Sequence, residues 1–277
     1  MATEQENDLL TDPRFEVLPF SSFDDQLEAI PDGSKIAITS SPEKSIMKTI
    51  ELTEQAANDG YEVIPHLAAR NVEDEAQLEE IAQRLEDVGV DDIFVPGGDN
   101  DEAGEFESSY ELLVALEELG YEFPKVGITG YPEGHAFIED DTLWEHLEKK
   151  EEYGDYIITQ ICFKPDTVVE WIDEVRAHDV ELPIEVGVPG AMDAKRMLSI
   201  AREVGVGDSI KYLQKTTGIG QFAKSLLGGG GKYTPDDFIE GIAPHYQDDH
   251  YKVSGVHLYT MNQAADTEEW RQDFMDN

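Results

Sequence analysis

Eight short apolar runs, each followed by a longer stretch of mixed polarity, constrain the fold of this 277-residue chain more than any other feature. The runs are rich in β-branched residues, as expected of strands that are buried on both faces. They cover residues 15–20, 35–40, 61–68, 92–97, 125–130, 156–162, 183–188 and 256–261. Between them, apolar residues recur at helical spacing, as in residues 73–90 with Leu78, Ile81 and Leu85 on one stripe.

Strands that alternate with helices are typical of a parallel sheet, and eight such units in about 250 residues predict a (β/α)8 TIM barrel. Extra helices are expected before the last strand, within residues 192–248. That region holds a glycine run, 228–231, which we interpret as a loop because it follows no strand. A doubly wound open sheet is the alternative fold. No linker or repeat divides the chain, so we expect residues 1–277 to form a single (β/α)8 barrel domain.

Helix boundaries can also be read from the sequence. We expect a helix over 41–60, with Ser41 as its cap, Pro42 in its first turn and Gly60 at its end. Two further helices are expected over 165–180 and 192–206. Only residues 21–30 separate the first two strands, which makes this the weakest unit of the predicted barrel.

The charge is extreme, with 61 acidic and 20 basic residues and a net charge of −41. We therefore expect no binding to nucleic acid or to anionic membranes. The acidic residues run from Glu4 to Asp276, which favours a surface adapted to a salty cytoplasm over an acidic tail for a basic partner. Molar salt shortens the Debye length to about 3 Å and screens such self-repulsion. The absence of a signal sequence and of long apolar runs predicts a cytoplasmic protein. The single cysteine, Cys162, excludes an internal disulfide.

Barrel enzymes carry their reactive groups at the carboxyl ends of the strands, and polar side chains recur at those positions here. They are Glu16, Thr39, Ser40, Ser41, His66, Arg70, Asp99, Tyr131, Glu133, His135, Thr159, Gln160, His257, Tyr259 and Asn262. Gly97 and Gly98, just before Asp99, would let a ligand approach the backbone. This set suits a flat, polar heteroaromatic ligand.

Other chemistries have weaker support. No metal site is expected, because His66, His135 and His257 belong to different strands without HxH or HExxH spacing. The chain has no GxSxG motif for a serine hydrolase and no strand-end lysine for a barrel aldolase. Each candidate also has an ordinary structural explanation, such as an ion pair for Glu16 or a turn for Asp99. Their joint placement at strand ends favours function.

Six segments in the right order resemble the methylenetetrahydrofolate reductase family. They are FEVLP at 15–19, PHLAAR at 65–70, PGGD at 96–99, GYPEGH at 130–135, YIITQICF at 156–163 and HLYTMN at 257–262. The resemblance extends over nearly the whole chain and implies a (β/α)8 barrel. It also implies the reduction of 5,10-methylenetetrahydrofolate to 5-methyltetrahydrofolate, which serves one-carbon metabolism and methionine supply. FAD is the implied cofactor, NAD(P)H a candidate electron donor and a folate the implied substrate.

The resemblance also implies roles for individual residues. Glu16 matches the acid that protonates the folate, and its apolar neighbours would raise its pKa. Asp99 matches an aspartate beside the flavin and the pterin, and Gln160 matches a glutamine that hydrogen-bonds the folate. The positions that match flavin contacts are Thr39, His66, Gly98, Asp99, Tyr131 and His135, with Lys149 and Lys150 near a basic pair that holds the diphosphate.

The departures from the family pattern indicate a divergent, haloarchaeal-type member. Gly97 replaces an arginine of the family's flavin site, and Ala194 stands where an aromatic residue often stacks on the substrate. Arg70 is a candidate for the missing cation. The alternatives are a folate- or flavin-binding accessory paralogue without catalysis and a flavin-independent reductase. The electron donor, a folate or methanopterin carrier and a homo-oligomeric state stay open.

Overall fold

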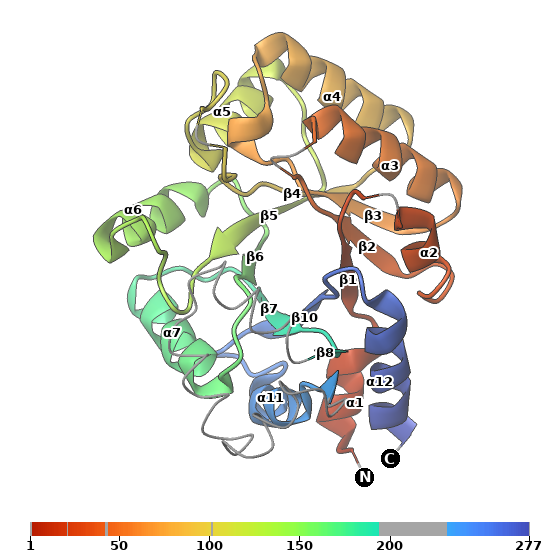
Figure 1. Cartoon of the computed structure of the whole chain (residues 1–277). Coiled ribbons are helices and arrows are strands. Elements are labelled where there is room, and N and C mark those ends of the chain that lie inside the picture. The colour runs from red at the N-terminus through yellow and green to blue at the C-terminus, as the bar shows by residue number, and fades with distance from the viewer. Residues whose placement is uncertain (1, 21, 42–43, 101, 194–231, 277) are drawn as a thin grey trace.

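The computed structural model describes residues 2–20, 22–41, 44–100, 102–193 and 232–276. Eight parallel strands form a nearly closed barrel, and helices surround it (Figure 1). The strand order is β3-β2-β1-β10-β7-β6-β5-β4, and a parallel bridge between His66 and Phe94 joins the two ends of this sheet. The predicted (β/α)8 barrel is therefore confirmed, and the open doubly wound sheet is not the fold.

Each predicted apolar run overlaps an observed strand of the barrel. The strands are β1 (Arg14–Val17), β2 (Lys35–Ile38), β3 (Glu62–Pro65), β4 (Asp92–Phe94), β5 (Lys125–Gly130), β6 (Tyr156–Thr159), β7 (Ile184–Pro189) and β10 (Val253–Tyr259). The α-helices are α1 (Glu4–Thr11), α2 (Phe23–Leu27), α3 (Ile46–Asn58), α4 (Glu75–Asp87), α5 (Ser109–Leu119), α6 (Asp140–Lys150), α7 (Pro165–Ala177), α11 (Asp236–Ile242) and α12 (Ala264–Asp276). None of the helices that the structure describes combines the length and apolar character that a membrane span requires.

Two predicted helix starts are wrong. The cap of α3 is Ser45, whose hydroxyl accepts the N–H of Met47 at 3.3 Å. The carbonyl oxygen of Ser41 instead accepts the N–H of Lys44 at 3.0 Å, and the helix begins one turn later than expected. Pro42, expected in its first turn, lies outside the described residues. Residues 192 and 193, expected to open a helix, form β8 (Met192–Asp193), which pairs antiparallel with β9 (Lys232–Tyr233).

The rest of the helix expected over 192–206 lies outside the described residues, as do Ala194 and the glycine run 228–231. Of the extra elements expected before the last strand, the structure describes α11 and a 3-10 turn, Ala243–His245. Sequence reasoning missed α1, which lies beside α12 near both chain ends (Figure 1). Only Leu9 and Leu10 of α1 are buried, so its amphipathic signal is weak.

Successive strand residues point to opposite faces, which divides the core into two parts. Phe15 and Val17 belong to the large apolar layer between the strands and the helices. A separate, smaller cluster consists of Ala37, Ile64, Phe94, Tyr156 and Ile158. Because β1 alternates, Arg14 and Glu16 share the face opposite to Phe15, which is the barrel interior.

Arg14 closes the interior near the amino ends of the strands. Its guanidinium contacts Glu185 of β7 at 2.5 Å and Asp92 of β4 at 3.1 Å, and it lies 4.2 Å from the ring centre of Tyr156. The Tyr156 hydroxyl donates to Asp92 at 2.7 Å. This buried, ion-paired group occupies the amino-terminal end of the barrel, which leaves the carboxyl end for a site.

Candidate functional site

A cavity of about 1610 Å³ lies at the carboxyl ends of β4, β5 and β6. Its walls come from the loops after these strands and from the facing sides of α6 and α7. Ligand pockets for a single small molecule usually measure about 300–1,000 Å³. This cavity therefore has room for more than one ligand, such as a cofactor together with a substrate.

Of the ten residues to which the family resemblance assigns a role, six line this cavity and four do not. Those that line it are Gly98, Asp99, Tyr131, His135, Lys150 and Gln160. Glu16, Thr39 and His66 are buried at the ends of β1, β2 and β3, and Lys149 is exposed on α6. The predicted set is thus divided between a cavity wall and the barrel interior, with Lys149 outside both.

Tyr259 lies between the cavity wall and the barrel interior and interacts with both. Its hydroxyl donates to the carbonyl oxygen of Thr159, next to Gln160, at 3.0 Å. Burial raises its pKa, and the negative charges of Glu16 and of Tyr131 raise it further. The phenol is therefore within electrostatic reach of both Glu16 in the interior and Tyr131 in the cavity wall.

The loop after β4 depends on Gly98 and on Arg70. Gly98 has φ of +91°, and a Cβ at this position would lie 3.1 Å from the Cβ of Ala68. Arg70 donates from Nε to the carbonyl oxygen of Asn100 at 2.8 Å and pairs with the carboxylate of Glu107. Arg70 lines the cavity as the sequence suggested, but part of its charge is already balanced.

Lys150 is a buried cation in the cavity wall. It is 4% exposed, and its ammonium donates to the hydroxyl of Thr129 at 3.0 Å. Burial lowers its pKa to about 8, and no carboxylate among the described residues pairs with it. Lys149, one position along α6, pairs with exposed Glu145 at 2.6 Å. A buried cation without a counter-charge would be stabilised by an anionic ligand such as a phosphate.

Glu16 lies in a buried cluster with two histidines. Its Oε2 is 3.1 Å from Nε2 of His257, and the rings of His257 and His66 lie 6.0 Å apart. Burial raises the pKa of Glu16 to about 7, although His66 opposes this rise. Burial also lowers the pKa of His66 to about 4 and that of His257 to about 3. Near neutral pH, Glu16 can therefore hold a proton while both imidazoles are neutral.

The same cluster has the composition of a metal site, which sequence spacing did not predict. Glu16, His66 and His257 offer three ligand atoms within 4.8 Å of one another, because barrel closure brings β1, β3 and β10 together. A histidine that ligates a metal almost always donates its other ring N–H to an acceptor. The Nδ1 atom of His257 has no such partner in the part of the chain that the structure describes. We therefore interpret the cluster as a site that holds a proton.

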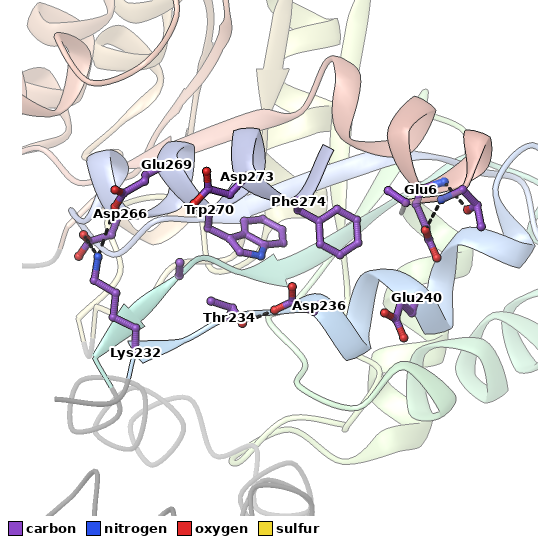
Figure 2. Close-up of a pocket in the computed structure, with 13 residues that line it drawn as sticks. Glu6, Lys232, Thr234, Asp236, Glu240, Asp266, Glu269, Trp270, Asp273 and Phe274 are labelled. Carbon is purple, nitrogen blue, oxygen red and sulfur yellow. Dashed lines mark hydrogen bonds and ion pairs between the residues drawn. The ribbon is translucent and has the colours of Figure 1, made fainter. Parts of the chain in front are cut away.

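A second pocket, of about 540 Å³, lies on the outer wall between α1, α11 and α12 (Figure 2). Trp270 and Phe274 line it, together with the carboxylates of Glu6, Asp236, Glu240, Asp266, Glu269 and Asp273. Lys232 at its edge contacts Asp266 at 2.7 Å and Glu269 at 3.5 Å. No residue that the sequence predicted for the site lines this pocket, so the strand-end cavity is the candidate site.

Comparison with known proteins adds a family match. The model of the family described as "Methylenetetrahydrofolate reductase" matches residues 20–217, a range that includes Asp99 and Gln160 but begins after Glu16. The similarity of the chain to a solved structure from Burkholderia cenocepacia J2315, assigned as a phosphonomutase, is remote. The TM-score is 0.43 and the identity 14%, over 68% of this chain and 85% of that one.

Three curated yeast proteins are similar to parts of the chain. Methylenetetrahydrofolate reductase 2 of Schizosaccharomyces pombe is 24% identical over 217 residues, which are 71% of this chain and 33% of that protein. Methylenetetrahydrofolate reductase 1 of the same yeast is 38% identical over 65 residues, 23% of this chain and 11% of that protein. Methylenetetrahydrofolate reductase 2 of Saccharomyces cerevisiae is 30% identical over 93 residues, 32% and 15% of the two chains. Each match spans a third or less of the relative's length.

Proposed function

The chain belongs to the methylenetetrahydrofolate reductase family, and on that premise we propose that it reduces 5,10-methylenetetrahydrofolate to 5-methyltetrahydrofolate with a bound flavin. One observation carries the proposal. Asp99 and Gln160 line one cavity large enough for two ligands, and the barrel that carries it holds a buried carboxyl group, Glu16, which keeps its proton near neutral pH.

The residues in the cavity are suited to FAD. Lys150 would balance the charge of the diphosphate, and the Gly97–Gly98 backbone would allow a close approach, with Tyr131 and His135 also in the wall. Outside the cavity wall, Thr39 and His66 at the ends of β2 and β3 each carry a buried polar atom, Oγ1 and Nε2, that has no partner among the described residues. When bound, FAD would supply the hydride. Lys149 is left out of the proposed site because it is exposed on α6 and already paired with Glu145.

In this proposal Asp99 and Gln160 bind the pterin. Gln160 accepts the N–H of Ile161 at 2.9 Å through Oε1, which fixes the amide and leaves Nε2 to donate to a ligand. The Asp99 carboxylate is an acceptor for pterin N–H groups. Glu16 would protonate the folate nitrogen, which opens the five-membered ring to the iminium that accepts hydride. Its burial keeps water from competing for that proton.

A Glu16→Gln variant tests this proposal directly. The variant should fold, bind FAD and allow the flavin to be reduced. Folate reduction should fall by about 10²–10⁴-fold, the usual contribution of a general acid. Glu62→Gln, the same substitution at an exposed position on β3, controls for effects of a Glu-to-Gln change outside the site. Near-normal folate turnover in the Glu16 variant would refute the assigned role.

A flavin-independent reductase is the second candidate, and Gly97 favours it. The arginine expected in the flavin site is absent, and Arg70 is engaged with Glu107. The two candidates differ in the visible spectrum of protein purified in high salt. A flavin-free protein that reduces folate with NAD(P)H after exhaustive dialysis would establish the second candidate.

We further propose that residues 1–277 work as one domain in a cytoplasm of molar salt. The net charge of −41 supports the proposal of a cytoplasm of molar salt, because self-repulsion of this size is screened only at high ionic strength.

A further inference from the structure

We propose that His257 is a positioning residue, which donates a hydrogen bond from Nε2–H to Oε2 of Glu16 and so keeps the carboxyl proton on Oε1. This inference rests on the proposed function, in which Glu16 is the proton donor. It adds the atom from which the proton leaves and the group that selects that atom.

The two side chains face each other from adjacent strands. β1 and β10 pair in parallel, with Arg14 opposite His257 and Glu16 opposite Tyr259. His257 is fully buried, and its Nε2 lies 3.1 Å from Oε2 of Glu16. Tyr259 packs edge-on against the His257 ring at 4.8 Å, which limits rotation of the imidazole. No hydrogen bond from the described residues reaches Oε1, so that atom is left for a ligand.

The surroundings of His257 select its tautomer. Its Nδ1 is buried without a partner among the residues that the structure describes. A proton on Nδ1 would therefore leave a buried donor unpaired, which is rarer in proteins than an unpaired buried acceptor. A proton on Nε2 finds the Glu16 oxygen as its acceptor. The Nε2–H tautomer is thus favoured, and with Oε2 occupied as an acceptor the carboxyl proton belongs on Oε1.

The charged and titratable groups around the pair are Arg14 on β1, His66 on β3 and Tyr259 on β10. Burial, followed by repulsion from Arg14, lowers the pKa of His257, so this ring stays neutral when Glu16 is protonated. His66 opposes the rise in the pKa of Glu16 that burial causes. A neutral His257 can therefore act only as a fixed donor and not as a second acid.

The proton balance of the step is simple. The Oε1–H bond breaks as an N–H bond forms on the folate nitrogen, and the bonding electron pair stays on the Glu16 carboxylate. His257 keeps its proton and donates to Oε2 throughout, which stabilises the carboxylate that forms. A proton from water restores Glu16 between turnovers.

The first test uses wild-type protein and needs no activity. The 15N chemical shifts of the His257 ring, assigned by their loss in His257→Gln, report which nitrogen carries the proton. We expect the Nε2–H tautomer at pH 6 to 7, the range in which Glu16 keeps its proton. An Nδ1–H tautomer would overturn the inference, whereas absent folate reduction with an Nε2–H tautomer would count against the proposed function alone.

The second test compares two substitutions by their pH profiles of kcat. His257→Gln retains a donor near Nε2 and should keep most of the turnover. His257→Leu should lower the plateau by about 10- to 100-fold, the range for a hydrogen bond to a charged group. Its alkaline limb should move to higher pH, because the Glu16 carboxylate loses a donor that stabilises it.

The control is His250→Leu, which removes an exposed histidine paired with Asp173 at 2.8 Å and should change neither plateau nor limb. Equal losses in the Gln and Leu variants with an unmoved limb would indicate packing alone and overturn the inference. If His257→Leu does not fold, the wild-type tautomer and the Gln variant still decide the question.

Discussion

Replacing Glu16 by Gln should make the protein more stable at neutral and alkaline pH while it removes activity. Glu16 is 5% exposed, and burial raises its pKa from 4.5 to about 7. Each pH unit corresponds to about 1.36 kcal/mol, so this rise corresponds to about 3 kcal/mol of unfolding free energy. A buried glutamine has no charge to desolvate and avoids that cost.

The direction in which stability changes with pH follows from the number of protons bound in the folded and unfolded states. Between pH 4.5 and about 7 the folded protein keeps the Glu16 proton and the unfolded chain has lost it. The contribution of Glu16 to the free energy of unfolding of wild type therefore falls through this window as the pH rises. The other acidic residues are common to both proteins. The stability of the Gln variant relative to wild type should thus rise by about 3 kcal/mol across the window and level off above it.

Urea denaturation followed by tryptophan fluorescence measures this difference, at constant high KCl and from about pH 4 to about pH 8.5. Glu62→Gln serves again as the control for the loss of one exposed carboxylate. A difference between wild type and the Glu16 variant that stays constant over the whole range would refute the reasoning, because Glu16 would then titrate alike in both states.

Three further predictions follow from other parts of the molecule. Arg14→Met should lower the free energy of unfolding by about 3–5 kcal/mol in urea titrations, because the mostly buried carboxylates of Asp92 and Glu185 would lose their cation. A loss below about 1 kcal/mol would contradict this. Lys150→Met should weaken FAD binding by about 10- to 100-fold in fluorescence titrations, and Lys149→Met should have little effect; equal effects would argue against the proposed diphosphate site. Raising KCl from about 0.1 to 1 M, which shortens the Debye length from about 10 to 3 Å, should raise the midpoint of thermal unfolding; an unchanged midpoint would remove the support for salt adaptation.

The barrel itself was predictable, because strands buried on both faces leave short, β-branched runs that are visible without any tertiary information. The same local pattern did not predict the helices and strands whose positions depend on contacts with other parts of the chain. α1 carries only two buried residues, and composition does not reveal that Ser45 rather than Ser41 caps α3. Residues 192 and 193 pair with a strand far along the chain instead of opening a helix.

The sequence by itself determined which residue types end the strands, and therefore that Asp99 and Gln160 belong to the same end of one barrel. Only the tertiary structure decided that His257 meets Glu16 across 241 residues, because closing the sheet makes the first and last strands neighbours. It also decided between Lys149 and Lys150, because adjacent helical residues point about 100° apart and only one faces the cavity. Hydrophobic periodicity depends only on residues that are close in the sequence. The burial of a side chain, and therefore the raised pKa of Glu16, depends on the residues that the closed barrel packs around it.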